Sequence, residues 1–163
     1  YNREAFKESL KKDNIAYIYM GNEFGAKRQT KESYNEEGYA DFTKVIKEDI
    51  FLKGVERLKK GIEMGYKIVL LAAMQDPIRC HRSIMLGRYL NQNGFDIKYI
   101  LHEGNLGNQN DIEESLLNKY FIERNQLSID TLLGTSKTRY DMLEEGYMLA
   151  NKEIGYRTEG IDK

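Results

Sequence analysis

The sequence predicts an α/β fold, in which a parallel sheet carries helices on both faces and a helical C-terminal extension follows. Residues 15–20 form a short apolar and aromatic run, and residues 67–74 are almost continuously apolar. Such runs are typical of strands, the second of a strand buried on both faces. The order strand, helix, strand, helix, strand favours right-handed crossovers. We therefore expect one Rossmann-like domain, with 1–103 as the α/β core and 104–163 as the extension.

The first part of the chain alternates helical and extended patterns. Apolar residues at helical spacing predict a helix over 2–12, ahead of the strand at 15–20. A polar loop with glycines at positions 21, 25 and 38 follows, and a loop of that length is often functional. Residues 39–65 are predicted to form two helical pieces, ended by Gly65 in the position of a C-terminal glycine.

The second part continues the alternation and then becomes helical. After the strand at 67–74, a helix is predicted from Pro77 to about Asn91, closed by Asn93 and Gly94. The remaining patterns are a strand over 95–101, a Gly- and Asn-rich loop over 104–110, a helix over 111–124, an ambiguous stretch over 126–138 and a final helix over 139–152.

Composition narrows the class of protein. The 163 residues suit one hydrophobic core, and 40% hydrophobic with 31% charged residues is an ordinary globular balance. A formal net charge of -1 gives no overall reason to bind nucleic acid or anionic lipid. A single cysteine cannot form an intrachain disulfide, and no apolar run is long enough to span a membrane. We therefore expect a soluble cytoplasmic protein.

The candidate site is the segment from Asp76 to Arg82, directly after the strand at 67–74. Asp is a favoured helix N-cap and Pro a favoured first helical residue, so a helix is expected to begin at the strand's carboxyl end, where ligands bind in open parallel sheets. Arg79 and Arg82 could hold a phosphate or carboxylate. Cys80, beside cations, could be partly thiolate, and His81 could transfer a proton.

Simpler interpretations of the same residues stay open. A lone cysteine on a sheet-packed helix is more often a small buried hydrophobe. Adjacent helical residues point about 100° apart, which disfavours a direct Cys80–His81 nucleophile–base pair. The arginines could simply be solvated. Neither a zinc ligand set nor a phosphate-cradling or dinucleotide glycine motif is present, so no metal and no cofactor is expected.

Four stretches carry a resemblance to a bacterial family. Residues 17–27 are similar to its strand followed by a Leu-Gly-Gly-Arg-like loop, and residues 38–42 to its Gly-Tyr-x-Asp-Tyr segment. Residues 76–82 match its Asp-Pro-x-x-Cys-His-Arg signature, and residues 149–157 are similar to the C-terminal end of its longer members. The chain thus resembles the family called domain of unknown function 488. The resemblance implies an α/β fold and a site at the signature.

The same resemblance implies further site residues and some differences. Gly25, Lys27 and Arg28 of the long loop and Tyr39 become candidate ligand-binding residues beside the signature. Members usually begin with two more strands, and the chain lacks an initiator Met, so we expect residues upstream of it. Positions 72, 74 and 99 hold Ala, Met and Tyr where members often have Cys, Glu and His, which implies that the chemistry is not identical.

The leading hypothesis is an intracellular site for a small anionic or nucleotide-like ligand, with phosphoryl or glycosyl transfer or hydrolysis as the reaction if the protein is an enzyme. Arg79 and Arg82 would hold the charge, with Lys27 and Arg28 closing over it. A nucleic-acid-associated protein is the second hypothesis, supported by twelve tyrosines and a basic loop and opposed by the net charge. A partner-binding module built on the C-terminal helices is the third. No membrane partner is expected, and the sequence leaves the oligomeric state open.

Overall fold

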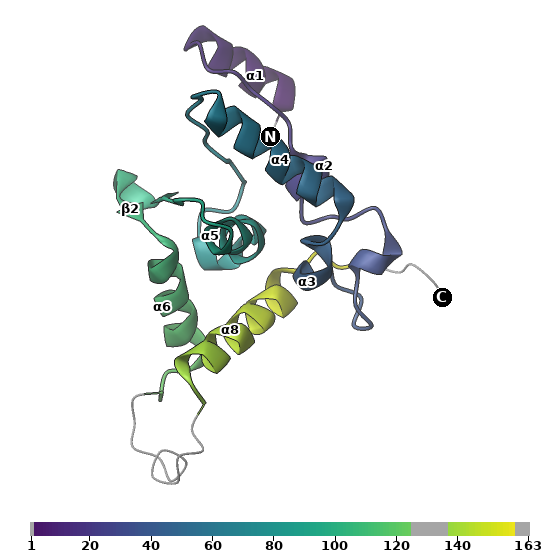
Figure 1. The fold of residues 1–163 in the computed structure, drawn as a ribbon, viewed down its shortest axis with the longest axis vertical. Helices are drawn as coiled ribbons and strands as arrows, with labels where there is room; N and C mark the ends of the chain where they lie inside the picture. The colour runs from purple at the N-terminus through teal and green to yellow at the C-terminus, as the bar shows by residue number, and fades with distance from the viewer. Residues whose placement is uncertain (1, 125–136, 159–163) are drawn as a thin grey trace.

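The computed structural model describes residues 2–124 and 137–158, and they form a mostly helical structure (Figure 1). The α-helices are α1 (Arg3–Lys12), α2 (Gly21–Phe24), α3 (Phe42–Val45), α4 (Asp49–Glu63), α5 (Arg88–Gln92), α6 (Gln109–Tyr120) and α8 (Arg139–Ile154). Short 3-10 helices are η1 (Lys31–Ser33), η2 (Pro77–Arg79) and η4 (His102–Gly104), and η3 (Arg82–Gly87) is a π-helix. Strands β1 (Tyr99–Ile100) and β2 (Leu106–Gly107) pair antiparallel, Tyr99 opposite Gly107.

The predicted parallel sheet with helices on both faces is wrong, and so is the Rossmann-like arrangement. In the described part of the chain the sheet has two strands, β1 and β2, in antiparallel order. Residues 15–20 and 67–74 are not helical, but neither enters a ladder. Their β-prone side chains favour extended backbone, whereas a sheet also needs a neighbouring strand to accept and donate hydrogen bonds. Val69 is 73% exposed and Leu71 is 62% exposed, so the second run is not a buried central strand.

Several helix predictions are confirmed. Helix α1 lies within the predicted 2–12, α3 and α4 are the two pieces predicted over 39–65, and α8 covers the predicted 139–152. Gly65 adopts φ 84° after α4, and the N–H of Tyr66 donates to the carbonyl of Gly61, which completes a Schellman cap.

Other boundaries differ from the predictions. The helix predicted from Pro77 is interrupted, because η2 ends at Arg79 and Cys80 is extended before the chain turns helical again. Of the strand predicted over 95–101 only β1 pairs, and α6 replaces the helix predicted over 111–124. Most of the ambiguous stretch 126–138 lies outside the described residues.

The core surrounds η3 and α5. The five residues 83–87 are all buried, as expected of a helical segment without a solvent face. Phe51 of α4 packs edge-on against Tyr89, with ring centroids 5.1 Å apart. Leu116 of α6 and Tyr147 of α8 belong to the same apolar cluster. Figure 1 shows α5 nearly end-on between the helices that cover it.

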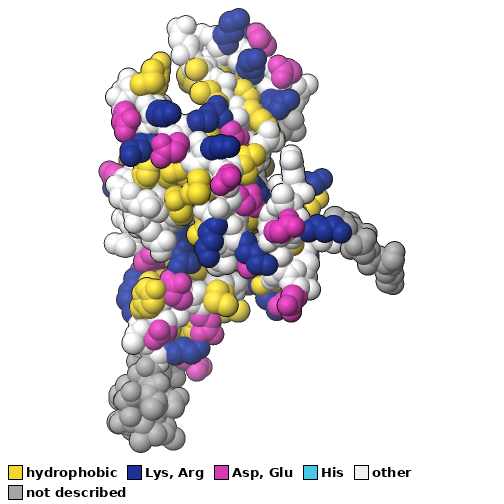
Figure 2. Space-filling view, turned by 45° about the vertical axis from the view of Figure 1, so that its right-hand side comes forward, with side chains coloured by type: hydrophobic (Ala, Val, Ile, Leu, Met, Phe, Trp, Pro, Cys, Tyr) yellow, Lys and Arg dark blue, Asp and Glu magenta, His cyan; other side chains and the backbone are white. Residues whose placement is uncertain are grey.

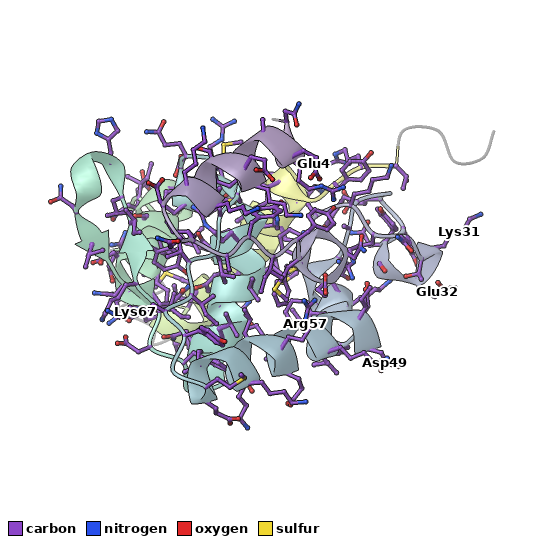
Figure 3. All side chains as sticks on the ribbon, turned by 90° about the horizontal axis from the view of Figure 1, so that it is seen from above. Glu4, Lys31, Glu32, Asp49, Arg57 and Lys67 are labelled. Carbon is purple, nitrogen blue, oxygen red and sulfur yellow. The ribbon has the colours of Figure 1, made fainter. Side chains whose placement is uncertain are left out.

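Charged side chains cover the outside of these helices. Lys31, Glu32 and Asp49 lie at the periphery in Figure 3. Hydrophobic side chains also reach the surface between charged ones on the face shown in Figure 2. Among the described helices, none combines the length and the apolar character that crossing a membrane would require.

Candidate functional site

The predicted site is a turn that joins two helical segments. The Asp76 carboxylate caps η2 by accepting a hydrogen bond from the Ile78 N–H at 3.2 Å, and Pro77 opens this 3-10 turn. Cys80 then adopts φ -126° and ψ 128°, and its carbonyl accepts hydrogen bonds from Ser83 and Ile84. The second helical segment therefore begins after Cys80, which places Arg82 in its first turn.

The thiol of Cys80 is closed off from solvent, since the residue is 2% exposed. A thiol must be reached by its substrate in order to act as a nucleophile, and burial in protein opposes that access. The environment of Cys80 is therefore that of a packing residue.

His81 is largely buried beside two arginines. Burial lowers the pKa of its imidazole from the ordinary value of 6.5, and the charges of Arg82 and Arg28 lower it further. The imidazole is therefore neutral at pH 7 and can accept a proton or a hydrogen bond. The effect of Arg28 indicates that this residue of the long loop lies near His81.

The arginines of the turn differ from those elsewhere in the described chain. Arg79 and Arg82 form no direct ion pair with a carboxylate among the side chains that the structure describes, and the same is true of Arg157. The charge of Arg79 nevertheless reaches Glu153, whose pKa is lowered mainly by Lys119 and also by this arginine. The other described arginines each have an ion pair: Arg3 with Glu4, Arg28 with Glu48, Arg57 with Glu23, Arg88 with Glu144, Arg124 with Glu114 and Arg139 with Glu114. Arg82 is also partly buried, so its charge has neither a direct ion-pair partner among the described side chains nor full contact with water.

Arg28 organises the long loop from within. It is buried, pairs with Glu48 and donates to the backbone carbonyls of Asn22, Glu23 and Gly25. At Gly25 a Cβ atom would lie 2.3 Å from the Gly21 carbonyl oxygen, so that position requires glycine. The guanidinium of Arg28 is thus occupied by the protein itself.

Lys27 and Tyr39 lie away from the signature turn. The Lys27 ammonium is 5.7 Å from the centre of the Tyr156 ring, and the Arg157 guanidinium is 5.4 Å from that of Tyr39. Lys27 lines a surface hollow to which no residue of 76–82 contributes. The structure therefore places Arg28 close enough to His81 for its charge to act there, but places Lys27 and Tyr39 beside the C-terminal segment.

A buried polar chain that the sequence analysis missed lies behind the turn. The Tyr99 hydroxyl donates to Gln109 at 2.5 Å, and Gln109 donates to the Tyr147 hydroxyl at 2.7 Å. Burial raises the pKa of Tyr99 to about 12. Gly87 makes room for this tyrosine. Its presence inside a helical pattern was the one sequence signal of a close approach.

The described residues do not form a metal-binding site. No three histidine, cysteine, aspartate or glutamate side chains within 2–124 and 137–158 are grouped so that they could hold one. Apart from the Asp76 carboxylate, which caps η2, the polar groups around the turn are guanidinium, imidazole and phenol, which suit an anion better than a cation.

Fold and site together define a mostly helical protein with an arginine-containing turn packed on its core. The family described as "Domain of unknown function DUF488" matches residues 1–90, more than half of the chain, and the protein belongs to this family. No curated protein and no solved structure matches it.

Proposed function

We propose that the turn from Asp76 to Arg82 binds a small anionic ligand. The observation that carries the proposal is that Arg79 and Arg82 form no direct ion pair with a described carboxylate, whereas most other described arginines do. An anion with phosphate or carboxylate oxygens would supply the missing charge through charge-assisted hydrogen bonds.

The neighbouring groups support binding more than covalent chemistry. Cys80 is buried, so it holds the turn in place, while the neutral His81 can accept a hydrogen bond from a protonated ligand oxygen. The finer form of the same hypothesis is a nucleotide-like ligand. Phosphoryl or glycosyl transfer would be the reaction, and His81 would move the proton.

Thermal unfolding in the presence of phosphate tests the proposal. A ligand that binds the folded state raises the melting temperature by mass action. Phosphate also stabilises proteins by exclusion from their surface, so the comparison is between variants at equal ionic strength. We expect phosphate to stabilise the unaltered protein more than Arg82→Gln.

Arg139→Gln is the matched control. Arg139 is an exposed arginine whose surface ion pair with Glu114 contributes little to stability. This variant should keep the full phosphate effect. An equal effect of phosphate on Arg82→Gln and on the unaltered protein would exclude the turn as the binding site.

A further inference from the structure

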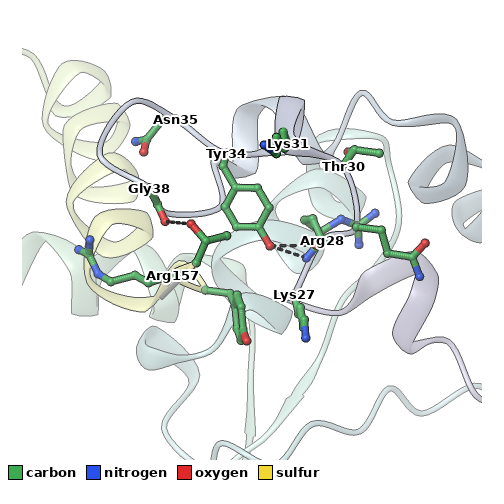
Figure 4. A pocket seen from close by; sticks show the side chains of 11 residues that line it. Lys27, Arg28, Thr30, Lys31, Tyr34, Asn35, Gly38 and Arg157 are labelled. Atoms are coloured by element: carbon green, nitrogen blue, oxygen red, sulfur yellow. Dashed lines mark hydrogen bonds between the residues drawn. The ribbon is translucent and has the colours of Figure 1, made fainter. Parts of the chain in front are cut away.

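A second cationic site lies in a hollow between the long loop and the C-terminal segment. The hollow has a volume of about 760 Å³ and is lined by Lys27, Arg28, Gln29, Thr30, Lys31, Tyr34, Asn35, Gly38, Tyr156, Arg157 and Thr158. Its volume is within the range of sites for small organic ligands, which is about 300–1,000 Å³. Figure 4 shows Tyr34 in the wall, with Lys27 and Arg28 on one side and Arg157 on the other.

The walls of the hollow are held by backbone pairing. Tyr34 forms an antiparallel β-bridge with Ala40, and Tyr39 forms one with Arg157. The second bridge joins the long loop to the C-terminal segment. The Tyr34 hydroxyl donates to the carbonyl of Arg28 at 2.9 Å and accepts from its N–H at 3.0 Å. The bridge between Tyr39 and Arg157 links segments more than a hundred residues apart in the sequence, so the hollow is a feature of the fold.

Positive charge dominates this hollow. None of the described residues that line it is acidic, whereas Lys27 and Arg157 are basic. Arg157 donates to the carbonyls of Glu37 and Lys152, which are neutral and leave its charge uncompensated. The nearby carboxylates of Glu48 and Glu37 are engaged by Arg28 and Lys152.

The other residues that line the hollow indicate a ligand that carries an organic group as well as a negative charge. Tyr34 and Tyr156 offer aromatic rings on which a base can stack, and Gln29 and Asn35 offer amides that can donate and accept hydrogen bonds. We infer that this hollow binds a nucleoside monophosphate, with its phosphate near Lys27 and Arg157 and its base against a tyrosine. The site is separate from the turn at Asp76 to Arg82.

Calorimetric titration with AMP tests the inference. Each of Lys27→Gln and Arg157→Gln removes one cation, and loss of a charge-assisted hydrogen bond should weaken AMP binding by about tenfold or more. Lys27 is exposed and has a ring contact alone, so its variant should fold normally even if Arg157→Gln loosens the C-terminal bridge. Lys59→Gln, on an exposed face of α4, is the matched control and should bind AMP normally.

Other outcomes overturn the inference. Absence of AMP binding, or unchanged affinity in both hollow variants, would contradict it. Inorganic phosphate binding as tightly as AMP would remove the role of the base. Arg82→Gln could instead lose AMP binding while Lys27→Gln and Arg157→Gln bind AMP normally. That result would place the nucleotide at the turn, which would support the proposed function and exclude a second site in the hollow.

Discussion

Cys80 and His81 stand side by side in the signature, and burial gives them different chemistry. The imidazole keeps a hydrogen-bonding role in its neutral form because burial and two nearby arginines lower its pKa. The thiol is almost completely enclosed. The adjacent Arg82 contributes to the lowered pKa of His81, but burial, which is its largest cause and also encloses Cys80, depends on what the turn packs against.

The lowered pKa of His81 makes the folded state sensitive to acid. The unfolded chain takes up a proton on this residue near pH 6.5, whereas the folded chain does so only at lower pH. The unfolded state therefore binds more protons in that interval, and the free energy of unfolding falls as the pH drops below about 6.5. His81→Gln should reduce the loss of stability between about pH 7.5 and 5.5. Urea unfolding midpoints at the two pH values measure it.

A surface change without a titrating group provides the control. Gln92 is exposed, and Gln92→Leu should keep the pH dependence of the unaltered protein. If His81→Gln showed the same dependence as the unaltered protein, the imidazole would not be held in its neutral form by the fold.

The enclosure of Cys80 predicts slow thiol chemistry. Iodoacetamide should alkylate the native protein far more slowly than the protein unfolded in urea, because the thiol is 2% exposed and must await an opening of the structure. Mass spectrometry of timed samples measures the two rates. Comparable rates would show an accessible thiol and would restore Cys80 as a candidate nucleophile.

At the scale of elements, two glycines in helical segments should respond oppositely to alanine. At Gly87, at the end of η3, a Cβ would lie 2.1 Å from the Tyr99 hydroxyl oxygen, and at Gly146, in α8, the nearest atom would be 3.7 Å away. Gly87→Ala should destabilise by about 1–3 kcal/mol through overpacking. Gly146→Ala should stabilise by about 0.5–1 kcal/mol, since alanine favours the helix.

Chemical denaturation of both variants measures the difference, and a third variant assigns its cause. Gly87→Ala combined with Tyr99→Phe should lose less stability than the sum of the two single changes, because the phenylalanine lacks the clashing oxygen. Strict additivity would mean that the clash with Tyr99 is not the reason for glycine at position 87.

The elements also show which parts of the fold the sequence can predict. Helices with clear apolar spacing and caps, such as α1, α4 and α8, were predicted closely because their hydrogen bonds are local. The runs 15–20 and 67–74 have strand-like composition, but strand pairing is a relation between distant segments, and periodicity does not show whether a partner is present. The candidate site was placed from Asp76, Pro77 and the cations and stays a prediction, whereas the burial of Cys80 depends on tertiary packing that the sequence does not show.

For the whole molecule, the buried chain Tyr99–Gln109–Tyr147 connects three elements. It runs from β1 through the first turn of α6 to α8, and Gln109 is 3% exposed. A buried hydroxyl that loses its partner keeps the full cost of desolvation, whereas an apolar replacement of the same shape does not. This series of hydrogen bonds therefore stabilises the packing of β1, α6 and α8 only while Tyr99, Gln109 and Tyr147 are all present.

Gln109→Leu tests this dependence on the whole network. It leaves the buried Tyr99 hydroxyl without its amide partner, whereas the Tyr147 hydroxyl still donates to Glu113 at 3.4 Å. The free energy of unfolding should therefore fall by about 1–3 kcal/mol for the group left unpaired. Adding Tyr99→Phe removes that hydroxyl and should recover part of the loss. Gln92→Leu, on an exposed residue at the end of α5, is the surface control and should change stability little. Further loss in the double variant would mean that the Tyr99 hydroxyl has a partner other than Gln109 and that the amide does not join β1 to α6.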